Sequence, residues 1–316
     1  MHHANQFYGH TYVLARYCDM PDPDHPQRVD GYLQHGWNIG DGLARGVPFV
    51  HGSTLFVWSE RTRRRAWSQG RRDVVAIGAP FAYLLQMDPL ERELEEQRAG
   101  TIFYPFHGWE GQQILGDHQR LAREIAETES GPVTVCLYWN EHQQPEIRAV
   151  YEQAGFRVIC HGRRGFWWRG QDREFLVRQL AELRRHRRVA SNRLTSAIWY
   201  GLLAGCEAAV YGDPMVLENA DPTFGGYPRI RDQWAALHGR ETDLAECRSL
   251  AQAELGADLL VGPAELRVLF GWQETWNEAR AAVARAAAGD TSARAAATDD
   301  TSARAASEDT RGAVHV

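Results

Sequence analysis

The sequence has no lysine, no Cys-x-x-C pair and no long apolar run. All 35 basic residues among its 316 are arginines, which excludes a lysine nucleophile and the lysine of a P-loop. Neither Gly-x-Gly-x-x-Gly nor a Walker A sequence is present, so any nucleotide site must be built differently. No window approaches the roughly eighteen apolar residues that a membrane-spanning helix needs.

Cysteines are few, odd in number and scattered. The five lie at positions 18, 136, 160, 206 and 247, which argues against a zinc site or a disulfide framework and favours reduced thiols in a cytoplasmic protein. The first residues lack the basic start and apolar stretch of a signal peptide, in keeping with that location. The arginine- and tryptophan-rich segment HGRRGFWWRG at 161–170 leaves peripheral contact with the inner membrane face open.

Acidic residues outnumber the arginines, and the net charge is −6. This negative charge argues against nucleic-acid binding. An apolar fraction of 44% suffices for hydrophobic cores. From about residue 278 the sequence consists mainly of Ala, Arg, Asp, Thr and Ser, and DTSARAAATD is followed by the similar DTSARAASED. We therefore expect a disordered tail over 289–316, preceded by one closing helix over 265–288.

Short apolar segments alternate with amphipathic ones along the rest of the chain. Strands are predicted at 32–34, 53–59, 73–80, 100–106, 133–139, 156–162, 187–191 and 207–213. Helices are predicted at 3–17, 60–70, 117–128, 144–154, 172–186 and 195–205. Such alternation is typical of parallel sheets covered by helices. The polar connector at 88–99 divides two series, so we predict an α/β protein with two Rossmann-like α/β/α domains, at 1–95 and 96–277, facing a cleft, and a helix end and tail at 278–316.

His35 lies where the predicted strand YLQ ends and a loop rich in Gly and Asn begins. Ligands of parallel sheets lie beyond the carboxyl ends of the strands, which places His35 at the predicted cleft. It is either a histidine bonded to nearby backbone or a catalytic base, because a neutral imidazole titrates close to physiological pH. Asn38, in the loop that follows, is a candidate contact to the acceptor or the sugar.

A second informative stretch is RRVASNRLTSAIWYGLLAG, where a strand leads through a polar loop into an apolar helix. Residues of these types are good N-caps, so a structural explanation is a well-capped helix. The functional explanation is that the N–H groups at the helix start and the neighbouring hydroxyls bind the phosphates of a nucleotide. The candidate phosphate ligands are Ser191, Asn192, Thr195 and Ser196.

The order of these parts resembles that of GT-B glycosyltransferases. The stretch QHGW and the helix entrance after residue 190 are particularly similar to the CDP-glycerol glycerophosphotransferase type, and the C-terminal half resembles bacterial sialyltransferases and capsule enzymes. The resemblance implies that His35 is the general base and that the loop from Ser191 to Ser196 holds the donor phosphates. Two departures matter: Gln34 replaces a tryptophan of the motif, and Asn192 and Arg193 interrupt a serine pair.

Further polar residues lie at other predicted strand ends. His107, Trp109 and Glu110 follow the strand at 100–106, and Glu141 follows the strand at 133–139. His107 is a candidate phosphate ligand or a hydrogen-bonded loop residue, and Trp109 and Glu110 are candidate acceptor or sugar contacts. Glu141 could bind a sugar hydroxyl or stabilise a helix start.

Arg163 is a further candidate phosphate ligand. No Asp-x-Asp pair ends a predicted strand, and Asp22-Pro23-Asp24 is typical of a turn. We therefore expect no metal and no cofactor, with nucleotide charge stabilised by N–H groups and side chains.

The sequence thus predicts a metal-independent, inverting glycosyltransferase that uses a nucleotide-sugar donor. The sugar is transferred to a hydroxyl or an amine of the acceptor. The sequence does not identify the acceptor, which is a glycan, a lipid carrier or a small metabolite, and it leaves open whether the protein forms a homo-oligomer. One alternative is a sugar-nucleotide epimerase or hydrolase; nonhydrolysing epimerases share the architecture but depend on several cleft carboxylates. The other is a non-catalytic GT-B-like partner subunit.

Overall fold

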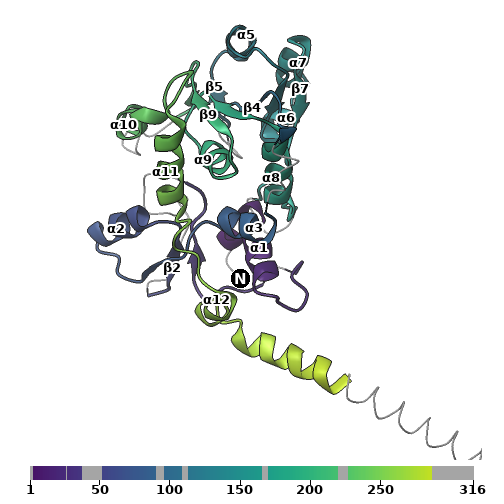
Figure 1. Ribbon diagram of the computed structural model, residues 1–316, viewed down its shortest axis with the longest axis vertical. Coiled ribbons are helices and arrows are strands. Elements are labelled where there is room, and N and C mark those ends of the chain that lie inside the picture. The colour runs from purple at the N-terminus through teal and green to yellow at the C-terminus, as the bar shows by residue number, and fades with distance from the viewer. Residues whose placement is uncertain are drawn as a thin grey trace, which may run out of the picture.

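The computed structural model describes residues 3–25, 27–37, 52–89, 96–108, 113–165, 170–219 and 227–286. In this part of the chain, two parallel sheets with flanking helices account for most of the structure (Figure 1). No helix of the described residues is long and apolar enough to cross a membrane. The predicted tail at 289–316 lies outside the described residues.

The first sheet is small and parallel, in the order β1-β2-β3. Its elements are η1 (His3–Gly9), α1 (His10–Tyr17), β1 (Tyr32–Leu33), β2 (Leu55–Val57), α2 (Glu60–Ser68), β3 (Val74–Ala76) and α3 (Pro80–Met87). The predicted helix at 3–17 is correct only from His10, because Phe7 and Tyr8 have non-helical backbone angles. The chain bends there, and η1 lies along β1 through the hydrogen bond from Leu33 N to Asn5 Oδ1 (2.8 Å).

The second sheet has five parallel strands in the order β7-β6-β4-β8-β9. Its elements are β4 (Thr101–Tyr104), α5 (His118–Thr128), β6 (Val133–Cys136), α6 (Trp139–His142), α7 (Pro145–Gln153), β7 (Arg157–Ile159), α8 (Phe175–Arg185), β8 (Arg188–Ser191), α9 (Ser196–Leu203) and β9 (Glu207–Val210). The chain proceeds outward from β4 to β7 and then returns to the other side of β4. This reversal makes the space above β4 and β8 the switch point of a Rossmann-like sheet.

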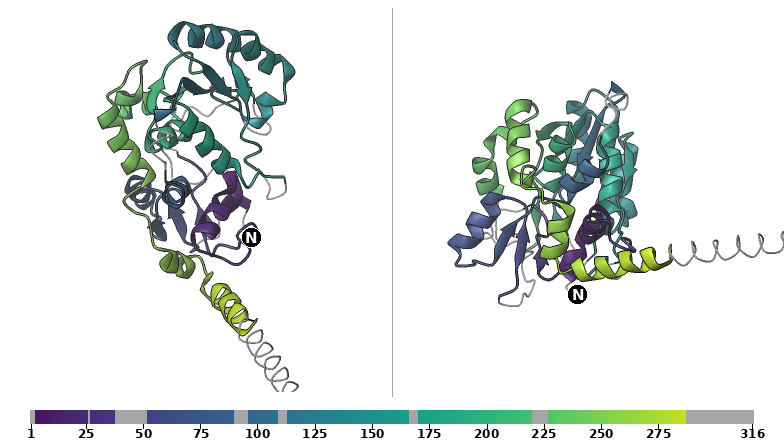
Figure 2. Two further views of the ribbon diagram at one scale, coloured as in Figure 1. Left: turned by 45° about the vertical axis from the view of Figure 1, so that its right-hand side comes forward. Right: turned by 60° about the horizontal axis from the view of Figure 1, so that its bottom comes forward.

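A short antiparallel pair joins β5 (Ile114–Leu115) to β10 (Val216–Leu217) and was not predicted. The remaining elements are α10 (Tyr227–Gln233), η2 (Ala235–Leu237), α11 (Leu244–Leu255) and α12 (Pro263–Leu269). Figure 2 shows α11 running from the second sheet toward the first. There, Ala79 N donates to Leu255 O (2.8 Å).

The single closing helix predicted over 265–288 is wrong. α12 ends at Leu269, and a separate helix occupies 273–286. Gly271 between them has a φ of 73°, a left-handed conformation that ends helices and that glycine adopts without strain. The turn lets Phe270 face inward, where its ring lies 4.9 Å from that of Phe56.

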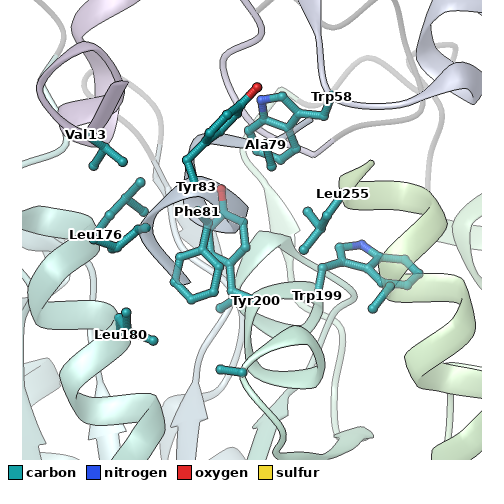
Figure 3. Close-up of a cluster of buried hydrophobic side chains, with 14 of the residues drawn as sticks. Val13, Trp58, Ala79, Phe81, Tyr83, Leu176, Leu180, Trp199, Tyr200 and Leu255 are labelled. Atoms are coloured by element: carbon teal, nitrogen blue, oxygen red, sulfur yellow. The ribbon is translucent and has the colours of Figure 1, made fainter. Parts of the chain in front are cut away.

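One hydrophobic cluster is shared by the two sheets, and each sheet also has a smaller cluster of its own. The shared cluster includes Val13 of α1, Phe81 of α3, Leu176 of α8 and Trp199 and Tyr200 of α9, all buried (Figure 3). The rings of Phe81 and Tyr200 stack with centroids 4.2 Å apart. This cluster fixes how the carboxyl end of β1 faces α9. The division at 95/96 stays a prediction.

Candidate functional site

A pocket lies at the carboxyl ends of β4 and β6, against the start of α9. It encloses about 110 Å³, less than the roughly 300–1,000 Å³ of typical ligand sites, so it can hold only part of a nucleotide sugar. Its lining is Tyr8, Tyr104, Pro105, His107, Cys136, Leu137, Tyr138, His161, Phe175, Gln179, Thr195, Ser196, Ala197 and Tyr200. The pocket therefore occupies the switch point of the second sheet.

His35 follows β1, as predicted, and the adjoining residues bind α9. Trp37 N donates to Ser196 Oγ at 3.0 Å. The buried Gln34 holds this loop on its other side: its Nε2 donates to Gly36 O (2.9 Å), and its Oε1 accepts from Trp58 N (2.8 Å). The amide that replaces the motif tryptophan thus fixes the loop. The two stretches identified in the sequence meet here, at the edge of the pocket.

The imidazole of His35 packs against aromatic rings of η1. Its centroid lies 4.2 Å from that of Phe7 and 5.3 Å from that of Tyr8. Burial, and then the charges of Arg164, His10 and His107, hold the pKa of His35 well below its usual value, so the ring is neutral at pH 7. The buried Nδ1 atom has no hydrogen-bond partner among the described residues.

The four predicted phosphate ligands differ in what they contact. Thr195 and Ser196 line the pocket at the start of α9. Thr195 makes no capping hydrogen bond with its side chain. Ser191 is fully buried, and its Oγ accepts from Arg193 N (3.2 Å). Asn192 is also buried: its Oδ1 accepts from Phe106 N and its Nδ2 donates to Asp213 O, both at 2.6 Å.

These contacts divide the residues of the predicted phosphate loop into two groups. Ser191 and Asn192 fix the backbone of loops around the pocket, whereas Thr195 and Ser196 present hydroxyls to it. The first intrahelical hydrogen bond near this end is that of Ile198 N to Thr195 O. The N–H groups of Ser196 and Ala197 precede it and, as in any helix, have no intrahelical acceptor.

His107 also lines the pocket, as its position after a strand predicted. Its Nδ1 lies 2.6 Å from Gly108 O, and its ring centroid lies 4.7 Å from that of Tyr138. Glu141, in the first turn of α6, accepts from Gly108 N at 2.8 Å and is buried. The carboxylate therefore holds the loop that carries His107, a role that differs from both the helix-start and the sugar-binding prediction for Glu141.

Several pocket residues were not predicted, and among them Tyr104 and His161 form a pair. The Tyr104 hydroxyl lies 2.9 Å from His161 Nε2. Burial raises the pKa of Tyr104 well above its usual value and lowers that of His161 to about 3, so both side chains are neutral at pH 7. Tyr8 was hidden in the supposed helix at 3–17, although the adjoining glycine, Gly9, was a signal of a bend.

Arg163 is not brought to the pocket lining: its carbonyl accepts from Asp172 N (2.8 Å), and its guanidinium lies near Gly170. The predicted contacts Asn38, Trp109 and Glu110 lie outside the described residues. Among the residues that the structure describes, no group of three or more His, Cys, Asp or Glu side chains could hold a metal ion. The absence of a metal in the reaction stays a prediction.

Comparison with known proteins gives distant structural similarity only. No family model matches the chain, and no curated protein matches it. One similar solved structure is a putative UDP-N-acetylglucosamine 2-epimerase from Listeria monocytogenes (14% identity, TM-score 0.34, 73% of this chain and 58% of that one). Another is a glycosyltransferase from Rickettsia africae ESF-5 (9% identity, TM-score 0.32, 80% and 69%). The CDP-glycerol glycerophosphotransferase type receives no support.

Proposed function

We propose that this protein is a GT-B-like glycosyltransferase that binds a nucleotide sugar at the start of α9 and uses His35 as the general base. One observation carries the proposal. The loop that begins with His35, from one sheet, is hydrogen-bonded through Trp37 to Ser196, at the switch point of the other. His35 does not itself line the pocket, but its loop is thereby held against a helix start whose Thr195 and Ser196 do.

The lowered pKa of His35 is compatible with a base that removes a proton from the acceptor. Because the pKa of His35 is lowered, the imidazole is unprotonated before reaction and can take the proton of an acceptor hydroxyl. A bound diphosphate adds negative charge nearby, which raises the pKa of the imidazole and favours that transfer. The base therefore becomes stronger when the donor is present.

The departing nucleotide needs its negative charge stabilised. The N–H groups of Ser196 and Ala197 and the positive end of the α9 dipole supply part of this. Thr195 and Ser196 line the pocket, and their hydroxyls add hydrogen bonds. His107 also lines it, but its Nδ1 faces Gly108 O, so its Nε2 donates to a phosphate only when the ring is protonated. The helix N–H groups and the two hydroxyls need no rearrangement when charge develops.

The lining contributed by the described residues contains no carboxylate. Epimerases of this architecture depend on several carboxylates in the cleft, so the lining favours transfer over the alternative of epimerisation or hydrolysis. A non-catalytic subunit would conserve nucleotide binding without turnover.

The test is a binding screen of the purified protein against UDP, GDP, ADP, CDP, TDP and CMP and their sugar conjugates. A ligand that binds only the folded state stabilises it by about 2.7 kcal/mol at a hundred times its Kd, so the melting temperature rises. A shift with one nucleotide family supports the proposal and names the donor class. If no ligand of the panel raises the melting temperature, the proposal is contradicted.

Incubation of the bound donor without acceptor then separates the classes. A transferase leaves most of the donor intact until an acceptor hydroxyl is added, whereas an epimerase or hydrolase converts it alone. Rapid formation of an epimerised sugar nucleotide in the absence of acceptor would replace the transferase proposal.

A further inference from the structure

A buried carboxylate on α11 receives donors from three separate elements. Glu254 is 3% exposed, and its Oε2 accepts from the indole Nε1 of Trp37 at 2.8 Å. Its Oε1 accepts from the indole Nε1 of Trp234 at 3.3 Å and pairs with Arg61 Nε at 2.5 Å. Arg61 belongs to α2, so the cluster joins the first sheet's helix to the second sheet's last helices.

Trp37 is the member of this cluster that contacts a residue of the pocket lining. Its backbone N–H donates to Ser196 Oγ, while its indole N–H donates to Glu254. Its ring packs between those of Trp199, 5.1 Å away, and Trp234, 4.9 Å away. The residue two positions after His35 is therefore fixed at both its main chain and its side chain.

We infer that Glu254 is a positioning residue that keeps the His35 loop seated against the start of α9. The inference rests on the proposed function for its effect on turnover. Glu254 acts through Trp37 and touches no substrate. Its distance along the chain from His35 explains why no sequence pattern indicated it.

The geometry gives a specific reason for a carboxylate here. Three donors converge, and both oxygens of Glu254 must accept. In Glu254→Gln the amide oxygen would take the side of Arg61 and Trp234, because two donors meet there. The amide NH₂ group would then face the indole N–H of Trp37, and the two donors repel. This substitution therefore releases Trp37 selectively while preserving side-chain shape.

The first experiment follows indole N–H signals by NMR in Glu254→Gln, with the Trp37 signal assigned from Trp37→Phe. We expect the Trp37 N–H to lose its protection from hydrogen exchange while the Trp234 N–H keeps it. In turnover, kcat should fall on the order of tenfold to a hundredfold because the base is displaced. The Kd of the nucleotide should change less than threefold, since α9 keeps its N–H groups.

A double variant tests the repulsion itself. Trp37→Phe removes the N–H that opposes the amide, so Glu254→Gln combined with Trp37→Phe should have the same kcat as Trp37→Phe alone. Its melting temperature should be lower than that of Trp37→Phe, because the amide no longer opposes the charge of Arg61. Glu246→Gln, on the exposed face of the same helix, is the matched control and should leave every readout unchanged.

Two results would overturn the inference. One is unchanged exchange of the Trp37 N–H in Glu254→Gln. The other is a lower melting temperature with full kcat, which would make Glu254 structural only. If no nucleotide binds the wild-type protein, the proposed function fails, and the exchange measurement still decides whether Glu254 holds Trp37.

Discussion

His35 combines a pKa that burial lowers with a position after a strand, next to Tyr8 of the pocket lining. Its lowered pKa has burial as the largest cause and neighbouring positive charges as the next. At the same scale, Ser196 serves two partners. Its oxygen accepts from Trp37 N, and its side chain also lies within hydrogen-bonding reach of Tyr200.

His35→Ala should reduce kcat by roughly 10²- to 10⁴-fold, the usual contribution of general acid–base catalysis, with an unchanged Kd for the nucleotide. Steady-state kinetics and calorimetric titration measure the two quantities. His25→Ala is the control because His25 is an exposed histidine paired with Asp22. Full turnover by His35→Ala would remove this residue from the mechanism.

Ser196→Ala should weaken nucleotide binding about fivefold, the equivalent of one hydrogen bond of about 1 kcal/mol. Titration of the variant measures the change, and Ser68→Ala on the exposed end of α2 provides the control. An unaltered Kd would mean that the helix N–H groups and Thr195 bind the phosphates without this hydroxyl.

At the scale of elements, α9 is held close to β8 by a glycine. A Cβ at Gly201 would lie 2.3 Å from Val189 Cγ1, closer than side chains ever approach. The helix therefore packs on the Val189 side chain of β8 more tightly than any other residue at position 201 would allow. Its first turn, with Thr195 and Ser196, is thereby placed at the switch point.

Gly201→Ala should destabilise the protein by about 1–3 kcal/mol through overpacking and weaken nucleotide binding, because α9 must move away from β8. Thermal unfolding and titration measure these effects. Combining the substitution with Val189→Ala should recover part of the affinity by making space. Gly262→Ala, where a Cβ meets nothing within 4 Å, should have little effect. Unchanged binding in Gly201→Ala would show that the position of α9 does not matter for the nucleotide.

At the scale of the whole molecule, the shared hydrophobic cluster contains neutral histidines at its edges. His10 is fully buried and His161 is 3% exposed. Burial lowers the pKa of each to about 3. Below pH 6.5 the unfolded chain binds protons at these positions and the folded chain does not, so the free energy of unfolding falls as pH falls from about 6.5 toward 3.

Between pH 7 and 5.5 each of these two histidines should therefore cost roughly 1 kcal/mol of stability. Urea unfolding at both pH values measures the loss. His161→Asn removes one titrating group, so the difference between the two pH values should shrink by about the same amount, even if the variant is less stable at both. An identical pH dependence in wild type and variant would mean that His161 is not buried as a neutral group.

The sequence by itself determined the alternation of strands and helices, and with it the two parallel sheets, because apolar periodicity and glycine stops act over short distances. It also placed His35, His107, Thr195 and Ser196 at the correct ends of their elements. It did not predict the bend at Phe7 and Tyr8 or the break between two helices at Gly271. At both places the backbone leaves the helical conformation although the surrounding residues favour a helix.

Only the tertiary structure decided which of these residues meet. The hydrogen bond between Trp37 and Ser196 joins elements 159 positions apart, and that from Trp37 to Glu254 spans 217. Burial of the shared cluster drives these contacts, and burial is a property of the packed molecule. The same packing sets the lowered pKa of His35 and turns Asn192 and Glu141 toward backbone N–H groups, because a buried polar side chain must find a partner wherever the fold provides one.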